Sequence, residues 1–427
     1  MSDKNSLKVF SGETERLICL SSEITDCHHS TPKWTDYGKI VIRNFNIKNG
    51  SLSLEKPSYT DDKTFNDRIA RSVPEAGDLI ITREAPMGQV CKIPDGLECC
   101  LGQRMVLIKP NKHRISSDYL LYALQSEFVQ KQINQNDRTG SIVSNLRIPV
   151  LKDLLIPMFD SVKRQWVAKI LSAIDAKIEL NNQINKKLEG MAKLIYDYWF
   201  VQFDFPISKE QAIAMGDPSL EGIPYKSSGG KMVYNEQLKR EIPEGWGCEI
   251  ISELLDESKG LKKIPTSQYL KEGKYPIVDQ SRDFICGFTD DKNSVINGSN
   301  EAKIIFGDHT RILKLINFDF ARGADGTQVI SSNPERLPLH FFYHTLLKID
   351  LSNYGYARHF KFLKAINILV PNSVLSTEFD KIVSEFYIKK RENIRQNQKL
   401  SELRDWLLPM LMNGQVSPTR EASVTEQ

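Results

Sequence analysis

The sequence predicts a mixed α/β (α+β) protein, in which two globular domains and two long helices form an internal repeat. Three observations predict this class. The 427 residues are about three times a typical domain length, so more than one core is expected. A heptad-like apolar pattern occurs twice, and short strand-like and helix-like segments precede each copy. We therefore expect two domains separated by two long antiparallel coiled-coil helices, related by a pseudo-two-fold repeat.

The long helices follow from apolar spacing. From Val167 to Tyr198, apolar residues recur at alternating intervals of three and four, as along one side of a helix. The pattern returns 212 residues later, from Phe379 to Met410, and is apolar at seven of the eight positions where the first copy is apolar. At about 1.5 Å per residue, such a helix is longer than one small domain can cover.

Polar residues interrupt both copies at matching places. Lys177 and Asn181 in the first copy correspond to Lys389 and Asn393 in the second. A polar pair that fixes the register of two facing helices explains this match better than independent packing of each helix on its own domain, which stays the alternative. The predicted seam consists of Ile174, Lys177, Asn181, Leu188, Phe386, Lys389, Asn393 and Leu400.

Shorter elements precede each helix. Strand-like runs are predicted at 39–47, 79–83, 105–109 and 154–157 in the first half, and at 303–306, 312–316, 327–331 and 367–371 in the second. Helical patterns are predicted at 118–132 and 339–349. Residues 204–246, rich in Gly, Pro and Ser, predict an extended connector, and Pro409 with Asn413-Gly414 predicts a kink or end of the second long helix. The predicted organisation is a domain at 1–160, a long helix at 161–201, a connector at 202–246, a domain at 247–375, a long helix at 376–414 and a polar tail at 415–427.

Composition narrows the function. The 57 basic and 54 acidic residues nearly balance, so any nucleic-acid surface must be local. The seven cysteines are an odd number without paired zinc-site spacing, which favours reduced thiols and a cytoplasmic location. No apolar run of about 18 residues indicates a membrane span.

Catalytic motifs are missing from the sequence. No phosphate-binding loop, dinucleotide loop or nucleophile elbow is present, so we expect neither a catalytic residue nor a cofactor in this chain. Glu301 and Lys303, with Asp290 and Asp291 upstream, loosely imitate a metal-dependent nuclease, and this enzyme is kept as an alternative. The segment Cys27-His28-His29 is read as a surface loop rather than a metal site, because adjacent side chains rarely converge on one ion. A coiled-coil scaffold that binds only proteins is the third possibility.

Two similar domains held apart by helices suit an extended ligand such as double-stranded DNA. The candidate DNA-binding residues lie in polar loops beside predicted strands, where Arg, Lys, Asn, Gln, His, Ser and Thr can contact phosphates and base edges. In the first half they are Arg43, Asn44, Arg83, Gln103, Arg104, Arg138, Thr139 and Ser141. In the second half they are Arg282, His309, Thr310, Arg311, Arg322, Arg358, His359 and Lys361.

Several segments resemble the specificity subunit of type I restriction-modification systems. The most specific ones are Leu171–Asp175, Tyr198–Pro206, Tyr225–Met232 and Glu241–Trp246. Gly77–Ile80 and Phe306–Arg311 are similar to its target-recognition motifs. The resemblance spans essentially the whole chain.

The resemblance implies two target recognition domains, each reading half of a split, asymmetric DNA sequence, with a gap set by the helices. It also implies partners: two modification subunits that bind S-adenosylmethionine and methylate adenine, and two restriction subunits that use ATP and Mg2+. We expect contacts with the modification subunits on the outer helix faces and around Tyr198–Phe205. Burial of Trp199 and Phe200 against the neighbouring domain is the alternative.

Overall fold

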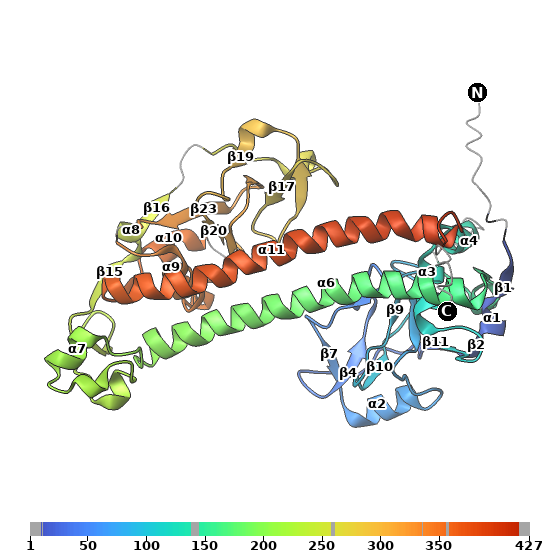
Figure 1. The fold of residues 1–427 in the computed structure, drawn as a ribbon, viewed down its shortest axis with the longest axis horizontal. Helices are drawn as coiled ribbons and strands as arrows, with labels where there is room; N and C mark the ends of the chain where they lie inside the picture. Colours follow the sequence, from blue (N-terminus) through green and yellow to red (C-terminus); the bar gives the residue numbers. More distant parts are fainter. Residues whose placement is uncertain are drawn as a thin grey trace, which may run out of the picture. The chain divides into compact units, whose positions relative to one another are not determined.

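The computed structural model describes residues 10, 12–137, 145–257, 261–334, 336–355 and 358–417. The chain divides into two compact units, Met1–Glu179 with Asn397–Gln427, and Leu180–Gln396. The division crosses both long helices, α6 (Ser161–Tyr196) and α11 (Ser373–Met412), so each unit contains one segment of each helix (Figure 1). Within the described residues, no helix is both long and apolar enough to cross a membrane.

The first unit contains two four-stranded sheets and an antiparallel strand pair. One sheet is antiparallel, in the order β2 (Ser21–Asp26), β11 (Met105–Pro110), β8 (Leu79–Thr82) and β9 (Val90–Lys92). The other has the order β10 (Cys99–Leu101), β4 (Lys39–Ile42), β7 (Ser58–Thr60) and β3 (Trp34–Thr35). The pair consists of β1 (Thr14–Arg16) and β12 (Leu155–Pro157). The helices include α1 (Leu17–Leu20), α2 (Asp62–Ile69), α3 (Ser117–Gln125), α4 (Glu127–Asp137) and α5 (Ile148–Lys152). The unit also contains a 3-10 turn, η1 (Asn44–Asn46), and a small hairpin of β5 (Ile47–Lys48) and β6 (Ser51–Leu52).

The second unit repeats this plan. Its antiparallel sheet has the order β16 (Leu255–Glu257), β23 (Thr327–Ser332), β20 (Lys303–Gly307) and β21 (Leu313–Ile316). The other sheet has the order β18 (Gly287–Thr289), β17 (Tyr275–Val278), β22 (Phe320–Arg322) and β19 (Val295–Ile296). The strand pair is β15 (Gly247–Ile250) with β24 (Asn367–Val370), and the helices are α8 (Ile251–Leu254), α9 (Leu339–Leu347) and α10 (His359–Lys364).

The repeat extends to strand pairing. In each second sheet, one parallel pair joins strands far apart in sequence: β4 with β10 in the first unit, and β17 with β22 in the second. The sheets differ at their edges, because β3 extends the first beyond β7 whereas β19 extends the second beyond β22. The predicted mixed α/β class with an internal repeat is confirmed.

The long helices pair within each unit and run in opposite directions (Figure 1). In the first unit, Arg404 of α11 forms an ion pair with Asp175 of α6 at 3.0 Å. In the second, Asn393 donates to Asn185 at 2.9 Å and Asn181 donates to Gln396 at 2.8 Å. As the residue numbers of α6 increase from 175 to 185, the numbers of their partners on α11 decrease from 404 to 393, so the two helices are antiparallel.

Six of the eight predicted seam residues are buried or half-buried, and two are not. Ile174, Asn181 and Asn393 are buried, and Leu188, Phe386 and Leu400 are half-buried. Lys177 and Lys389 were predicted wrongly, because both are exposed and Lys389 binds Glu392 of its own helix at 3.4 Å. The predicted alternation chose the neighbouring residue at every second step. After Val167, the face of α6 that is buried or half-buried consists of Leu171, Ile174, Ile178, Asn181, Asn185 and Leu188.

The expected extended connector is folded. Residues 202–246 contain α7 (Lys209–Ala214) and a hairpin of β13 (Met232–Asn235) and β14 (Arg240–Pro243). Their aromatic side chains Phe203, Phe205, Tyr225 and Trp246 belong to the core of the second unit. Trp199 and Phe200 lie in the same core, so burial rather than a free surface accounts for them. Helix α11 continues three residues beyond Pro409, to Met412.

Candidate nucleic-acid interface

Three loops meet at corresponding places in both units. We call them the first, second and third loop. In the first unit they are residues 43–46 after β4, 83–89 between β8 and β9, and 102–104 between β10 and β11. In the second unit they are 279–286 after β17, 308–312 between β20 and β21, and 323–326 between β22 and β23.

The first and third loops start from the same backbone arrangement in both units. Gly102 N donates to Ile42 O at 2.8 Å, and Gly323 N donates to Val278 O at 2.9 Å. Each bond extends a parallel strand pair by one residue, which fixes where the two loops diverge. By this register Arg43 corresponds to Asp279, and Asn44 to Gln280.

In the first unit the loops are tied through Glu84. Asn44 Nδ2 donates to the Glu84 carbonyl oxygen at 2.6 Å, and Arg104 Nε lies 3.1 Å from a Glu84 carboxylate oxygen. Gln103 donates to the carbonyl oxygen of His29. The loops enclose a hollow of about 350 Å³, whose lining consists of Pro32, Trp34, Arg43, Asn44, Phe45, Ala85, Gln103 and Arg104. The structure thus brings together four predicted residues that sequence separates by up to 61 positions (43 to 104).

Arg83 lies inside the first unit instead. Its guanidinium donates to both carboxylate oxygens of Asp26, at 2.7 and 2.9 Å, and to Leu146 O at 3.0 Å. The expectation that Arg83 contacts DNA is therefore corrected to a role in holding the start of the second loop. Arg138, Thr139 and Ser141 lie outside the described residues.

In the second unit Gln280 joins all three loops. Its Nε2 donates to Asp325 O at 2.8 Å, and its Oε1 accepts from His309 N at 3.1 Å. Its backbone oxygen accepts from the Thr310 hydroxyl at 2.7 Å. Beneath it, Lys314 donates to Asp279 O at 2.8 Å, and burial lowers the pKa of this ammonium. The loops of the second unit are thus held by backbone and amide contacts, as in the first.

Two predicted residues of the second unit are structural. His359 is buried, with one ring nitrogen 2.9 Å from Asp308 O and the other 3.0 Å from Gly355 O. Arg322 is also buried and donates through Nε to Thr327 O at 2.7 Å. Their polar atoms are engaged by the protein, so the prediction that they contact DNA is corrected to support of the neighbouring loops.

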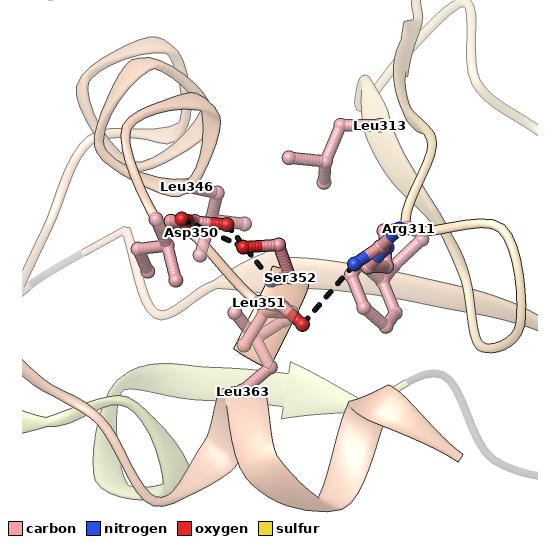
Figure 2. Close-up of a pocket in the computed structure, with 9 residues that line it drawn as sticks. Arg311, Leu313, Leu346, Asp350, Leu351, Ser352 and Leu363 are labelled. Carbon is pink, nitrogen blue, oxygen red and sulfur yellow. Dashed lines mark hydrogen bonds between the residues drawn. The ribbon is translucent and has the colours of Figure 1, made fainter. Parts of the chain in front are cut away.

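The Arg311 side chain points toward Leu351 in the pocket that both residues line (Figure 2). It has a φ of 60°, and its Nη1 donates to Leu351 O at 3.2 Å. It borders a pocket of about 260 Å³ with Asp350 and Ser352, where hydrogen bonds from Ser352 hold the pKa of the Asp350 carboxyl below its usual range. The contact fastens the second loop to the chain after α9.

The predicted residues that remain exposed in the second unit are Arg282, Thr310, Arg311, Arg358 and Lys361, and His309 is half-buried. Asp325 is exposed beside them and forms an ion pair with Lys263 at 2.9 Å, which lowers the pKa of its carboxyl. The surface therefore combines basic and acidic groups, a composition that suits base edges as well as phosphates.

Sequence reasoning missed Trp34, Phe45 and Glu84. Trp34 and Phe45 are half-exposed aromatic residues. Their positions before and after Arg43 in the sequence could have indicated that they lie near it. Glu84 carried no signal, because its role depends on the distant partners Asn44 and Arg104.

The residues proposed for the alternative nuclease site form ion pairs and hydrogen bonds with other residues of the chain. Lys303 pairs with Glu301 at 2.6 Å, and Lys262 pairs with Asp291 at 2.5 Å. Asp290 accepts from Lys274 N at 2.9 Å. In the part of the chain that the structure describes, no three His, Cys, Asp or Glu residues gather where they could hold a metal ion. Cys27 is buried, and burial raises the pKa of its thiol.

The fold and the loops define a two-domain protein. Both domains have the same arrangement of first, second and third loops, which we call the three-loop frame, and they differ in the side chains that these loops carry. The family described as "Type I restriction modification DNA specificity domain" matches residues 29–190. The resemblance is thereby confirmed: residues 29–190 match this DNA specificity domain, and the chain is similar to specificity subunits of type I restriction enzymes.

Similar proteins agree with this assignment. The chain is 25% identical over 363 residues to the type I restriction enzyme MjaIX specificity subunit of Methanocaldococcus jannaschii, covering 80% of this chain and 78% of that protein. It is 22% identical over 405 residues to the HindI specificity subunit of Haemophilus influenzae, covering 81% and 88%. The S subunit structure from M. genitalium has a TM-score of 0.54 at 16% identity, covering 96% of this chain and 98% of that one, and supports the fold.

Proposed function

We propose that this protein is the DNA-recognition subunit of a type I restriction-modification complex and has no catalytic role of its own. The observation that carries the proposal is the recurrence of the three-loop frame in both units. Each frame presents polar side chains next to strand ends, where they can enter a groove. The family description supports DNA as the ligand, and we propose that it is double-stranded.

Each unit is proposed to read one half of a bipartite site. Equivalent positions of the frame hold different groups: Arg43 in the first unit corresponds to Asp279 in the second, and Asn44 corresponds to Gln280. Arg43 is exposed, whereas the Asp279 carboxylate is buried and accepts from Ser281 and Tyr269, so the first unit presents a guanidinium at this position and the second unit presents no free reading group. Two frames with unlike side chains favour two unlike half-sites, hence an asymmetric target.

The helices are proposed to dock two modification subunits. Met191 and Leu194 on α6 are 48% and 67% exposed, and their repeat equivalents on α11, Leu403 and Trp406, are 43% and 58% exposed. Large apolar side chains exposed at matching positions of a repeat suit two copies of the same partner. The modification subunits would supply S-adenosylmethionine chemistry, and two restriction subunits would supply ATP- and Mg2+-dependent cleavage.

The test is to insert one heptad into both helices, after Glu179 and after Gln396, and to map methylated adenines in cells that carry the partner subunits. Seven residues add about 10.5 Å of helix, or about three base pairs of DNA. The expected result is a longer gap with both half-sites unchanged. Altered bases, or methylation without sequence preference before any insertion, would refute the proposal.

Two controls separate the alternatives. Cleavage by the isolated chain with Mg2+, abolished by Glu301→Ala, would establish the nuclease. Unaltered mobility of target DNA in the presence of the modification subunit would instead favour a protein-binding scaffold.

A further inference from the structure

Arg43 is held differently from the other arginines near the first-unit loops. Its Cζ lies 4.8 Å from the ring centroids of both Trp34 and Phe45. By contrast, Arg83 is bound by Asp26 and Arg104 by Glu84. In the described part of the chain, the Arg43 side chain forms no ion pair or hydrogen bond, so all five of its N–H groups are available to a ligand.

The backbone beneath Arg43 is also fixed. Arg43 N donates to Asn46 Oδ1 at 2.9 Å, and the buried Asn46 side chain donates to Ser53 O at 2.9 Å. Stacking on two rings restricts the guanidinium further, because Arg packs its flat face on aromatic surfaces. A rigid guanidinium loses little conformational freedom when it binds, which favours directional recognition.

Chemistry around the hollow favours a base over a phosphate. The amides of Asn44 and Gln103 line it beside Arg43, and the Glu84 carboxylate adjoins Arg104. This carboxylate offsets the charge of Arg104, so the hollow attracts a phosphate less strongly than two free arginines would, whereas binding of a neutral base edge depends less on net charge. The two-pronged donor face of arginine matches the O6 and N7 acceptors of guanine in the major groove.

We propose that Arg43 determines specificity by reading one guanine in the half-site of the first unit, and that Trp34 and Phe45 position it. This inference rests on the proposed function and adds the base class, the residue that reads it and the residues that orient it.

The experiment compares wild type, Arg43→Ala and Arg43→Lys, each assembled with the modification subunit, on DNA with every base at each position of both half-sites. Lys48→Ala, which removes an exposed positive charge from the same domain, is the matched control. In both Arg43 variants, the preference for guanine at one position is expected to fall about 5- to 150-fold. The second half-site keeps its preference, which also shows that the complex assembled.

Lysine separates the two kinds of contact, because it keeps the charge but not the fork. A phosphate contact would be largely rescued by Arg43→Lys, and Arg43→Ala would weaken all sequences equally and lower the salt slope by about one. Either result would overturn the inference while leaving the proposed function intact. Absence of any base preference in the wild-type complex would instead refute the proposed function.

The aromatic residues provide an independent readout. Trp34→Ala and Phe45→Ala are expected to reduce the preference at the same guanine position and at no other. A uniform loss across the half-site would show that these rings only support the fold, and it would contradict their positioning role.

Discussion

Replacing one asparagine of the buried pair between the long helices should destabilise the second unit, whereas replacing both should not. Asn393 donates to Asn185 at 2.9 Å, and both side chains are at least nine-tenths buried. Asn393→Leu leaves the Asn185 oxygen without this donor, and a buried polar group that loses its partner costs about 1–3 kcal/mol. Asn185→Leu has the reciprocal effect. The double variant removes both polar groups and buries apolar surface instead, so its stability is expected to lie near that of the wild type or above it.

Urea unfolding followed by tryptophan fluorescence measures this, because Trp199 and Trp246 lie in the core of the second unit. Because each single variant costs about 1–3 kcal/mol and the double variant lies near the wild type, the double-mutant cycle should give a coupling energy of about 2–6 kcal/mol. Lys389→Leu is the control: its side chain is 57% exposed, so the change is expected to stay within about 0.5 kcal/mol. Effects of the single asparagine variants that add within about 0.5 kcal/mol would refute the pairing, and a large effect of Lys389→Leu would restore the seam predicted from the sequence.

Three further outcomes are expected. Burial lowers the pKa of His344 to about 4, so between pH 6.5 and 4 the unfolded state binds more protons than the folded state. The free energy of unfolding should therefore fall by about 3 kcal/mol as the pH drops through that window. His344→Phe should flatten this pH dependence, as measured by urea unfolding. Arg404→Met removes the ion pair with Asp175 and should cost the first unit about 2 kcal/mol, measured by urea unfolding followed by the fluorescence of Trp166, which packs against the core of that unit; a change below about 0.5 kcal/mol would contradict this. Arg311→Ala frees the second loop from Leu351 and should alter methylation at one half-site only, as read by sequencing of methylated adenines; equal loss at both would contradict it.

Local pattern was sufficient for much of the fold. The strands predicted at 79–83, 105–109 and 303–306 appear as β8, β11 and β20, because each is a buried apolar run whose neighbours in the sheet are also buried. The pairings of β1 with β12 and of β15 with β24 could not be predicted. Each joins segments more than a hundred residues apart, and strands of three or four residues carry too little pattern to identify a partner.

The phase of the helix seam shows a second limit. Ile170 and Leu171 are both apolar, so the spacing accommodates a buried face through either one. The fold buries Leu171 completely and leaves Ile170 half-buried. Asn185, a member of the buried face, lies outside the predicted seam because the 3-4 alternation passes through the apolar Ile184 beside it. Only its hydrogen bond with Asn393 reveals it.

The candidate site could be predicted to the level of segments but not of side chains. Arg43 and Arg83 each directly follow a β-strand, so the sequence treats them alike. Asp26, 57 residues before Arg83, binds that guanidinium and removes it from the surface. Arg43 meets Trp34 and Phe45 instead, and its donors stay available. The difference comes from tertiary neighbours, which spacing along the chain does not specify.

The position equivalent to Arg43 explains why the two units cannot exchange readers by one substitution. Asp279 is buried, accepts from Ser281 N at 2.8 Å and from the Tyr269 hydroxyl at 3.2 Å, and its backbone oxygen binds Lys314. An arginine there would leave those donors without a partner and place a second cation beside a buried ammonium. Under the proposed function, recognition in the second unit would therefore come from groups farther along the loops, such as Arg282 and the half-exposed His309. A shared frame can thus carry different specificities only when each unit moves its reading residues to positions that its own core leaves free.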